Sequence, residues 1–205
     1  ETEAGELTLT FLGHGTLMLT FLGKTIHVDP YSRVADYAQL PKADLILITH
    51  GHRDHLDPDA LAEIRTDDTQ IILPPVCTDR VEGGTVMKNG DVLSLETMII
   101  EAVPAYNIVH KRDSGDPFHP KGEGNGYVLT CGESRVYIAG DTENIPEMKD
   151  LEDIDAAFLP MNLPYTMDPE MAADAAKVFR PKILYPYHFG DTDTGELEAL
   201  LSDEK

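Results

Sequence analysis

The chain has 205 residues, 41% of them hydrophobic and 26% charged, a composition typical of a soluble globular protein. No apolar run approaches the roughly 20 residues that a membrane-spanning helix requires, so a membrane span is excluded. The 37 acidic residues outnumber the 16 basic ones, and the formal net charge of −21 disfavours nucleic-acid partners and anionic membranes. We expect one domain over residues 1–205.

The first half of the chain is dominated by short strand patterns. Alternating or continuous apolar residues predict strands at 7–12, 16–22, 25–30, 44–49, 70–74, 91–95 and 98–104. The run DLILIT at 44–49 is apolar almost throughout, which indicates a strand covered on both faces. Asp57 and Pro58 open a short helix, because aspartate caps a helix and proline suits its first turn.

The second half mixes strands and helices after a long loop. Residues 105–126 show no periodicity, and a loop of this length in a compact domain is usually functional. Further strands are predicted at 126–132, 134–140, 155–160 and 182–188, and helices at 146–151, 168–179 and from 195. Helices must cover the apolar strands, so the order favours a layered α/β fold with two packed sheets.

Metal-binding side chains stand where three predicted strands end. They are His50, His52, Asp54 and His55 after the strand 44–49, Asp141 after the strand 134–140, and His188 at the end of the strand 182–188. A single histidine after a strand is most often a surface or core residue. Three imidazoles and a carboxylate within six positions are rarely so, and the later Asp and His strengthen the interpretation as a metal site.

Imidazole and carboxylate are ligands for zinc, iron or manganese. His50 and His52 stand two apart, so an extended segment points both the same way, and Asp54 and His55 can face a second metal. The two oxygens of Asp141 can bridge two ions. Two ions about 3.5–4 Å apart can generate a hydroxide near neutral pH and clamp a substrate oxygen.

The motif THGHRDHLD resembles the HxHxDH signature of the metallo-β-lactamase superfamily. AGDT around Asp141 resembles its bridging-aspartate motif, and YPYHFGDTD around His188 resembles its final histidine motif. Within the superfamily, FLGHGTLML, FHPKGEGNGY and AGDTENIPEM look like the UlaG-like branch of metal-dependent hydrolases, which includes lactonases. The resemblance spans Leu7 to about Leu201 and implies a four-layer αββα sandwich.

The resemblance also implies two divalent ions, with zinc preferred over manganese or iron. The implied ligands are His50 and His52 for the first ion, Asp54, His55 and His188 for the second, and Asp141 as the bridge. The superfamily usually supplies one more histidine to the first ion, where this chain has Asn107. His110 and His119 can replace it, and we favour His119 because HPKG resembles a recurrent element of this branch. The alternative is that His119 packs the loop or faces substrate, and that only one ion binds.

Four further residues are expected at the substrate site. His14 lies in a Gly-His-Gly turn that the resemblance places beside the metals, where it contacts substrate, supports a ligand or serves only the turn. Asn107 and Tyr165 are expected to line the pocket. Lys121, with its neighbouring glycines, can hold an anionic group or belong to a solvated lid. Asp29 is expected to orient the metal loop by hydrogen bonding.

These residues predict a metal-dependent hydrolase in which a metal-activated hydroxide attacks an ester, lactone, amide or phosphoester of a small molecule. Asp54 orients or deprotonates the attacking water, with His119 beside it. The alternative is a metal-containing binding or sensing protein with an incomplete first metal site. The chain begins with Glu1 rather than Met, which indicates that an upstream segment was removed, so the compartment is left open between cytoplasm and periplasm. The oligomeric state is left open as well.

Overall fold

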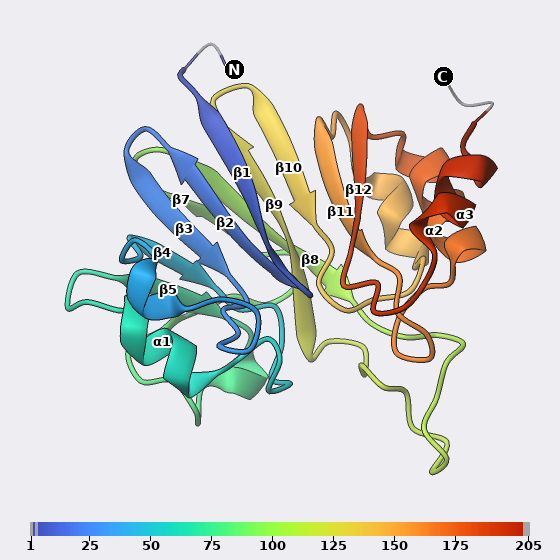
Figure 1. The fold of residues 1–205 in the computed structure, drawn as a ribbon, viewed down its shortest axis with the longest axis horizontal. Helices are drawn as coiled ribbons and strands as arrows, with labels where there is room; N and C mark the ends of the chain where they lie inside the picture. Colours follow the sequence, from blue (N-terminus) through green and yellow to red (C-terminus); the bar gives the residue numbers. More distant parts are fainter. Residues whose placement is uncertain (1, 3, 203–205) are drawn as a thin grey trace.

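Two six-stranded sheets form the centre of the structure, a computed structural model that describes residue 2 and residues 4–202. In Figure 1, helix α1 lies on one side of the sheets, and helices α2 and α3 lie on the other. The layers therefore follow the order helix, sheet, sheet, helix, and the predicted α/β sandwich is confirmed.

The first sheet has the strand order β1-β2-β3-β4-β5-β6. Its strands are β1 (Leu7–Gly13), β2 (Thr16–Phe21), β3 (Lys24–Val28), β4 (Leu45–Leu47), β5 (Gln70–Leu73) and β6 (Thr85–Val86). Strands β1 to β3 form an antiparallel meander, and β3 to β6 run parallel. The connections carry α1 (Pro58–Ile64) and two single-turn 3₁₀ helices, η1 (Tyr37–Gln39) and η2 (Pro75–Cys77).

The second sheet has the order β12-β11-β10-β9-β8-β7. Its strands are β7 (Val92–Ser94), β8 (Ile99–Ala105), β9 (Gly124–Cys131), β10 (Ser134–Ile138), β11 (Ala156–Pro160) and β12 (Ile183–Tyr187). Strands β7 to β10 are antiparallel, and β10 to β12 are parallel. The connections carry η3 (Pro146–Asp150) and α2 (Pro169–Phe179), and α3 (Thr194–Leu200) follows β12.

Three apolar clusters hold these layers together. The central cluster takes residues from both sheets, among them Leu19, Ile26, Ile100, Leu129 and Phe158. A second cluster packs α2 and η3 against the second sheet, and a third packs α1 against the first sheet. Strand β4 contributes to two clusters, because Leu45 and Leu47 face the other sheet while Ile46 faces α1. This explains the unbroken apolar run that the sequence shows there.

The helix starts follow the predicted capping chemistry. Asp57 caps α1 by accepting from the Asp59 N–H, and Asp168 caps α2 by accepting from the Met171 N–H at 2.7 Å. Proline occupies an early position in both helices. None of the helices in the described residues is long and apolar enough to cross a membrane.

The structure differs from the sequence prediction in a few elements. The segment around Pro146 is a 3₁₀ helix, and the two-residue strand β6 was not predicted because it is too short to show a period. Strands β8 and β9 reach into the predicted loop as far as the pair Ala105–Gly124, so the true loop is residues 106–123. That loop projects from the edge of the sheets where the parallel strands end (Figure 1).

Candidate metal centre

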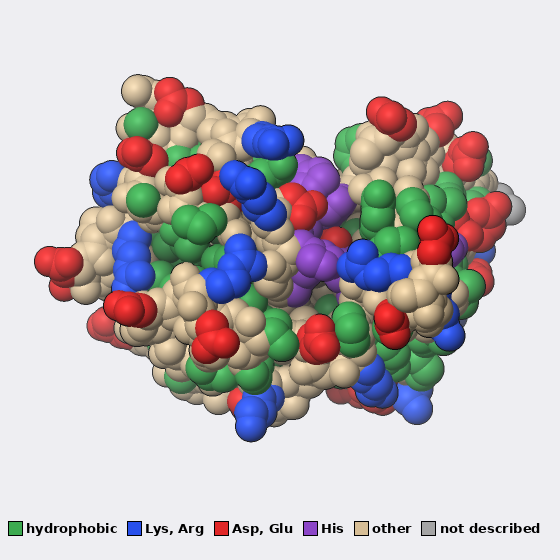
Figure 2. All heavy atoms as spheres, turned by 90° about the horizontal axis from the view of Figure 1, so that it is seen from below, with side chains coloured by type: hydrophobic (Ala, Val, Ile, Leu, Met, Phe, Trp, Pro, Cys, Tyr) green, Lys and Arg blue, Asp and Glu red, His purple; other side chains and the backbone are tan. Residues whose placement is uncertain are grey.

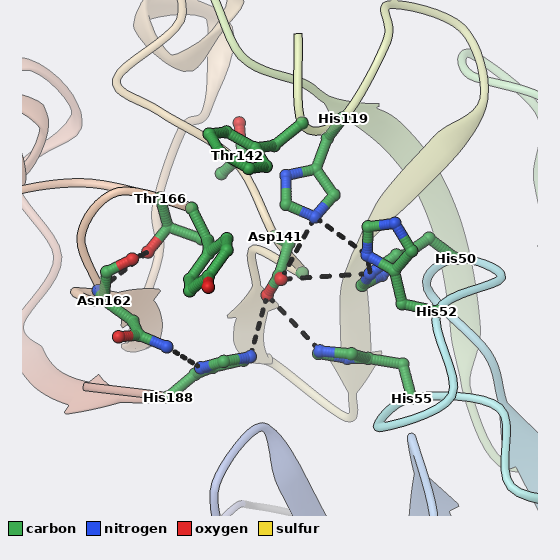
Figure 3. A network of polar contacts seen from close by, with 12 residues as sticks. His50, His52, His55, His119, Asp141, Thr142, Asn162, Thr166 and His188 are labelled. Carbon is green, nitrogen blue, oxygen red and sulfur yellow. Dashed lines mark hydrogen bonds and ion pairs between the residues drawn. The ribbon is translucent and has the colours of Figure 1, made fainter. Parts of the chain in front are cut away.

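Among the described residues, eight side chains with metal-binding atoms converge at this edge of the two sheets. They form two groups, each with its ligand atoms within 4.8 Å of one another. Group one is His50, His52, His119 and Asp141, and group two is His14, Asp54, His55 and His188. Figure 3 shows Asp141 with His50, His52, His55, His119 and His188 around it. They come from the loop after β4, the turn between β1 and β2, the loop 106–123, and the ends of β10 and β12.

In group one, the donor atoms face one another at short range. His52 Nδ1 lies 3.0 Å from His50 Nε2 and 3.2 Å from His119 Nε2. Asp141 Oδ2 lies 3.2 Å from His119 Nε2 and 3.8 Å from His50 Nε2. Burial, followed by the nearby His55, lowers the pKa of His50 well below its usual value. His50 is therefore neutral, which is the form that binds a metal.

In group two, the Asp54 carboxylate stands among three histidines. Its Oδ2 lies 2.8 Å from His14 Nε2, 3.6 Å from His188 Nε2 and 3.7 Å from His55 Nε2. Burial opposes ionisation of Asp54, but hydrogen bonds with His14 and His188 outweigh it and lower the pKa of Asp54 strongly. Asp54 is therefore ionised, and its side chain remains 34% exposed to the cleft.

Asp141 divides its two oxygens between the groups. Oδ2 faces group one, whereas Oδ1 lies 3.5 Å from His55 Nε2 and 3.6 Å from His188 Nε2 of group two. The dashed lines in Figure 3 run from this one carboxylate to His119, His50, His55 and His188. One carboxylate with an oxygen directed at each group is the arrangement that a bridging ligand requires.

Orphaned polar atoms test whether the centre fits metal ions. Among the described residues, four buried side-chain atoms have no hydrogen-bond partner, and three of these are His55 Nε2, His188 Nε2 and Asp141 Oδ1. Unpartnered buried polar atoms are costly, and these three point at one another rather than at protein partners. Nitrogen and oxygen donors without thiolate suit zinc, manganese or iron. The residues therefore fit two divalent ions.

Hydrogen bonds at Nδ1, the ring nitrogen that faces away from the metal groups, orient His55 and His188. Asp29 Oδ2 lies 2.7 Å from His55 Nδ1, and the same carboxylate accepts from the Thr49 N–H at 2.7 Å and the Thr49 hydroxyl at 2.6 Å. Asp29 thus holds the start of the metal loop, as expected. His188 Nδ1 lies 3.3 Å from the Asn162 amide. Such outer partners fix which ring nitrogen faces the metal.

The pKa of His55 is higher than that of an exposed histidine. Burial lowers the pKa of His55, but Asp141 and then Asp29 outweigh burial and raise this pKa to about 9. In the metal-free chain His55 is therefore a cation among carboxylates at neutral pH. A metal ion held by His55 and its neighbours in group two would supply the compensating positive charge in place of that proton.

Three residues of the centre adopt the left-handed backbone region, which is uncommon for residues other than glycine. They are His14 (φ 52°), Asp29 (φ 46°) and His188 (φ 45°). The His188 N–H donates to the His14 carbonyl at 2.9 Å, so two of these residues brace each other. Strained backbone of this kind clusters at functional sites.

Gly15 gives the most specific steric prediction at group two. A Cβ atom at this position would lie 2.8 Å from His55 Cε1 and 3.2 Å from His188 Cδ2. We expect Gly15→Ala to displace both imidazoles and weaken binding of the group-two ion by about 10- to 100-fold, the usual effect of disturbing ligand orientation. Titration against a chromophoric chelator measures this. Gly51→Ala is the control, because its Cβ would meet no atom closer than 3.6 Å, and equal group-two affinities in both variants would contradict the prediction.

The structure places the two loop histidines differently. His119 is buried and joins group one, whereas His110 is bound at its Nδ1 to Glu143 at 2.7 Å and belongs to neither group. His14 belongs to group two itself, because its Nε2 is among the possible ligand atoms there. The Gly-His-Gly motif correctly predicts a turn, but it does not predict that the His14 side chain reaches the metal groups.

Two of the predicted substrate residues lie elsewhere than expected. Asn107 is 6% exposed and uses its amide on His119, Glu143 and the Tyr165 carbonyl, so it supports a ligand instead of facing substrate. Lys121 binds Glu147 at 2.6 Å and covers the Tyr106 ring, so its charge is already paired with a carboxylate. This pairing favours the alternative of a solvated lid over an anion site at Lys121, whose side chain is 62% exposed. The glycines that follow Lys121 in the sequence could not indicate that its partner is Glu147, which is distant along the chain.

Tyr165 is 46% exposed and packs edge-on against Phe118, with ring centroids 5.1 Å apart. Phe118 in turn lines a cavity of about 390 Å³ that opens onto group one. Arg80 and Arg112 line the same cavity, and no motif in the sequence pointed to either of them. Figure 2 shows histidine side chains in the furrow between two lobes of this face, with Lys and Arg side chains nearby. The cavity therefore carries both basic and acidic side chains.

Comparisons with known proteins agree with this geometry. Residues 8–188 match the family model described as a beta-lactamase superfamily domain. A UPF0173 metal-dependent hydrolase of Methanopyrus kandleri is 30% identical over 195 residues, which cover 90% of this chain and 84% of the relative.

Solved structures agree as well. A crystal structure from Parabacteroides distasonis, assigned as a metal-dependent hydrolase, is 56% identical with a TM-score of 0.95 and covers 100% of this chain and 92% of its own. A metallo hydrolase of the archaeon Ignicoccus hospitalis is 26% identical with a TM-score of 0.79, covering 97% and 91%. The family match over most of the chain, together with the paired histidine groups, confirms the resemblance seen in the motifs. The chain belongs to the metal-dependent hydrolases of the metallo-β-lactamase superfamily, among the UPF0173 proteins.

Proposed function

We propose that the protein binds two divalent ions, zinc before manganese or iron, and hydrolyses an ester, lactone, amide or phosphoester bond of a small molecule. The observation that carries this proposal is the division of Asp141 between the groups, with Oδ2 at 3.2 Å from His119 and Oδ1 at 3.5 Å from His55. When bound, the ions supply a hydroxide near neutral pH and polarise the substrate oxygen.

The chain's own residues orient the reacting groups. Asp54 is ionised, faces the cleft and is held by His14, so it accepts a hydrogen bond from the attacking water and directs it. The low pKa of Asp54 favours this orienting role over storage of the proton. The His14 Nε2 contact at 2.8 Å limits rotation of the Asp54 carboxylate.

The cavity suits a small molecule of mixed character. Its volume of about 390 Å³ lies in the range of ligand pockets. Val76 and Phe118 offer apolar surface, while Arg80 and Arg112 offer positive charge. Acidic side chains, Asp116 and Glu123, are also part of the wall. The substrate is accordingly an amphipathic small molecule whose polar end enters toward group one.

The alternative of a binding or sensing protein rested on the missing histidine at Asn107. His119 Nε2 lies 3.2 Å from both His52 Nδ1 and Asp141 Oδ2. This distance supports His119 as the fourth donor of group one and favours the hydrolase over the binding or sensing protein.

Metal content and its removal test the proposal directly. We expect two ions per chain by elemental analysis of protein purified without added metal. A strong chelator should abolish hydrolysis across a panel of ester, lactone, amide and phosphoester substrates, and added Zn²⁺ or Mn²⁺ should restore it. The chelated protein should also unfold at lower temperature, because ions that bind only the folded chain stabilise it. One ion or none, with no turnover of any substrate after metal addition, would refute the proposal.

A further inference from the structure

Glu143 is a buried carboxylate that belongs to neither metal group. Its side chain has no exposed surface, and five hydrogen bonds converge on it. Oε1 receives the Asn107 amide at 3.0 Å, the His110 N–H at 2.7 Å and lies 2.7 Å from His110 Nδ1. Oε2 accepts from the N–H groups of Ile108 at 2.7 Å and Val109 at 2.6 Å. Glu143 thus binds four consecutive residues at the start of the loop 106–123.

Asn107 connects this carboxylate to the metal centre. Its Nδ2 donates to Glu143 and, at 2.9 Å, to the Tyr165 carbonyl. Both partners can only accept, so the NH₂ side of the amide must face them. The amide oxygen is thereby turned to the opposite side, where it accepts from the His119 N–H at 3.0 Å and lies 2.6 Å from His119 Nδ1.

The orientation of Asn107 determines the tautomer of His119. An amide oxygen only accepts, so the neighbouring Nδ1 must carry the proton. The other nitrogen, Nε2, then has a free lone pair and lies 3.2 Å from both His52 Nδ1 and Asp141 Oδ2. A metal ligand requires this unprotonated nitrogen, and the back-side acceptor also raises its basicity.

We propose that Glu143 is a positioning residue that, through Asn107, fixes the place and tautomer of His119 and so completes the first metal site from a loop. The proposal rests on the proposed dinuclear function. In this proposal Asn107 has a function of its own, because its amide orients His119, which lies twelve residues further along the chain.

Only a carboxylate fulfils this role at position 143. Donors face both oxygens, so an amide NH₂ placed on either side would meet N–H groups. Glu143→Gln changes the size of the side chain very little but places an NH₂ group against these donors, so it is an informative variant.

The test compares the metal affinities of variants of the full chain. We expect Glu143→Gln and Asn107→Leu to raise the dissociation constant of the group-one ion about 10- to 100-fold, the usual effect of losing an outer partner. The group-two ion should change less than twofold. Zn²⁺ titration against a chromophoric chelator resolves the two steps. Glu147→Gln is the matched control, since this glutamate on η3 pairs with the exposed Lys121 outside the centre.

A measurement on the unaltered protein supports the test if Glu143→Gln does not fold. In Zn²⁺-loaded protein labelled with ¹⁵N-histidine, His119 should show a slowly exchanging proton on Nδ1 and none on Nε2. A proton on Nε2 overturns the proposal, as does unchanged group-one affinity in folded Glu143→Gln. If the unaltered protein binds no ion at group one, the proposed function fails. If it binds two and the variants do as well, only the role of Glu143 fails.

Discussion

Asp141→Asn is expected to release both metal ions and to abolish hydrolysis. The carboxylate faces group one with one oxygen and group two with the other. Burial raises the pKa of Asp141, but His188 and His55 outweigh burial and hold it well below the usual range. The amide keeps the size but loses the charge and one of the two acceptor oxygens. We expect both ion affinities to fall by more than about 100-fold, beyond the effect of a lost outer partner.

Elemental analysis and kcat/KM on the best substrate of the panel measure this result. Asp150→Asn is the control, because this exposed aspartate ends η3 and lies in neither metal group. It should retain two ions and full activity. An Asp141→Asn protein that keeps two tightly bound ions would show that the carboxylate does not bridge them.

The second large effect is expected from His119→Ala. Because His119 is the donor of group one that comes from the loop 106–123, its loss should remove the group-one ion and leave the group-two ion bound. Hydrolysis should fall with that ion, since both ions are needed to activate water and clamp the substrate oxygen. The metal content of the variant should therefore be one ion per chain, against two in the unaltered protein.

His110→Ala is a close control for this experiment. His110 lies on the same loop but contacts Glu143 rather than either metal group, and its backbone N–H to Glu143 survives the substitution. It should keep both ions. If His119→Ala also keeps two ions, or if His110→Ala loses one, the choice of His119 over His110 is wrong.

The sandwich itself was predictable because the strands and helices of each layer show a pattern of apolar residues in the sequence. Strand β4 shows an unbroken apolar run since Ile46 packs against α1 while Leu45 and Leu47 face the other sheet. Helix α2 shows both its Asp168 cap and its apolar face. Strand β6 shows no such pattern, because two exposed residues cannot show a period.

The metal loop was predictable for a different reason, namely that its donors are close in sequence. His50, His52, Asp54 and His55 follow one strand within six positions, so local geometry alone keeps them together. Asp141 and His188 could be added because both follow strands that end at the same edge of a parallel arrangement. These residues supply six of the eight donors in the two groups.

The remaining contacts depend on tertiary structure. His119 meets His52 across 67 positions, and Lys121, two residues further on, turns outward to Glu147. Nothing in HPKG decides which of these side chains points inward. The inward position of His119 goes with hydrogen bonds to Asn107, at the start of the same loop, and from Asn107 to Glu143, which lies beyond β10. The sequence by itself determined the layers and the chemistry of the ligands. The tertiary structure decided that His119 rather than His110 joins group one, because that choice depends on long-range hydrogen bonds that no local pattern encodes.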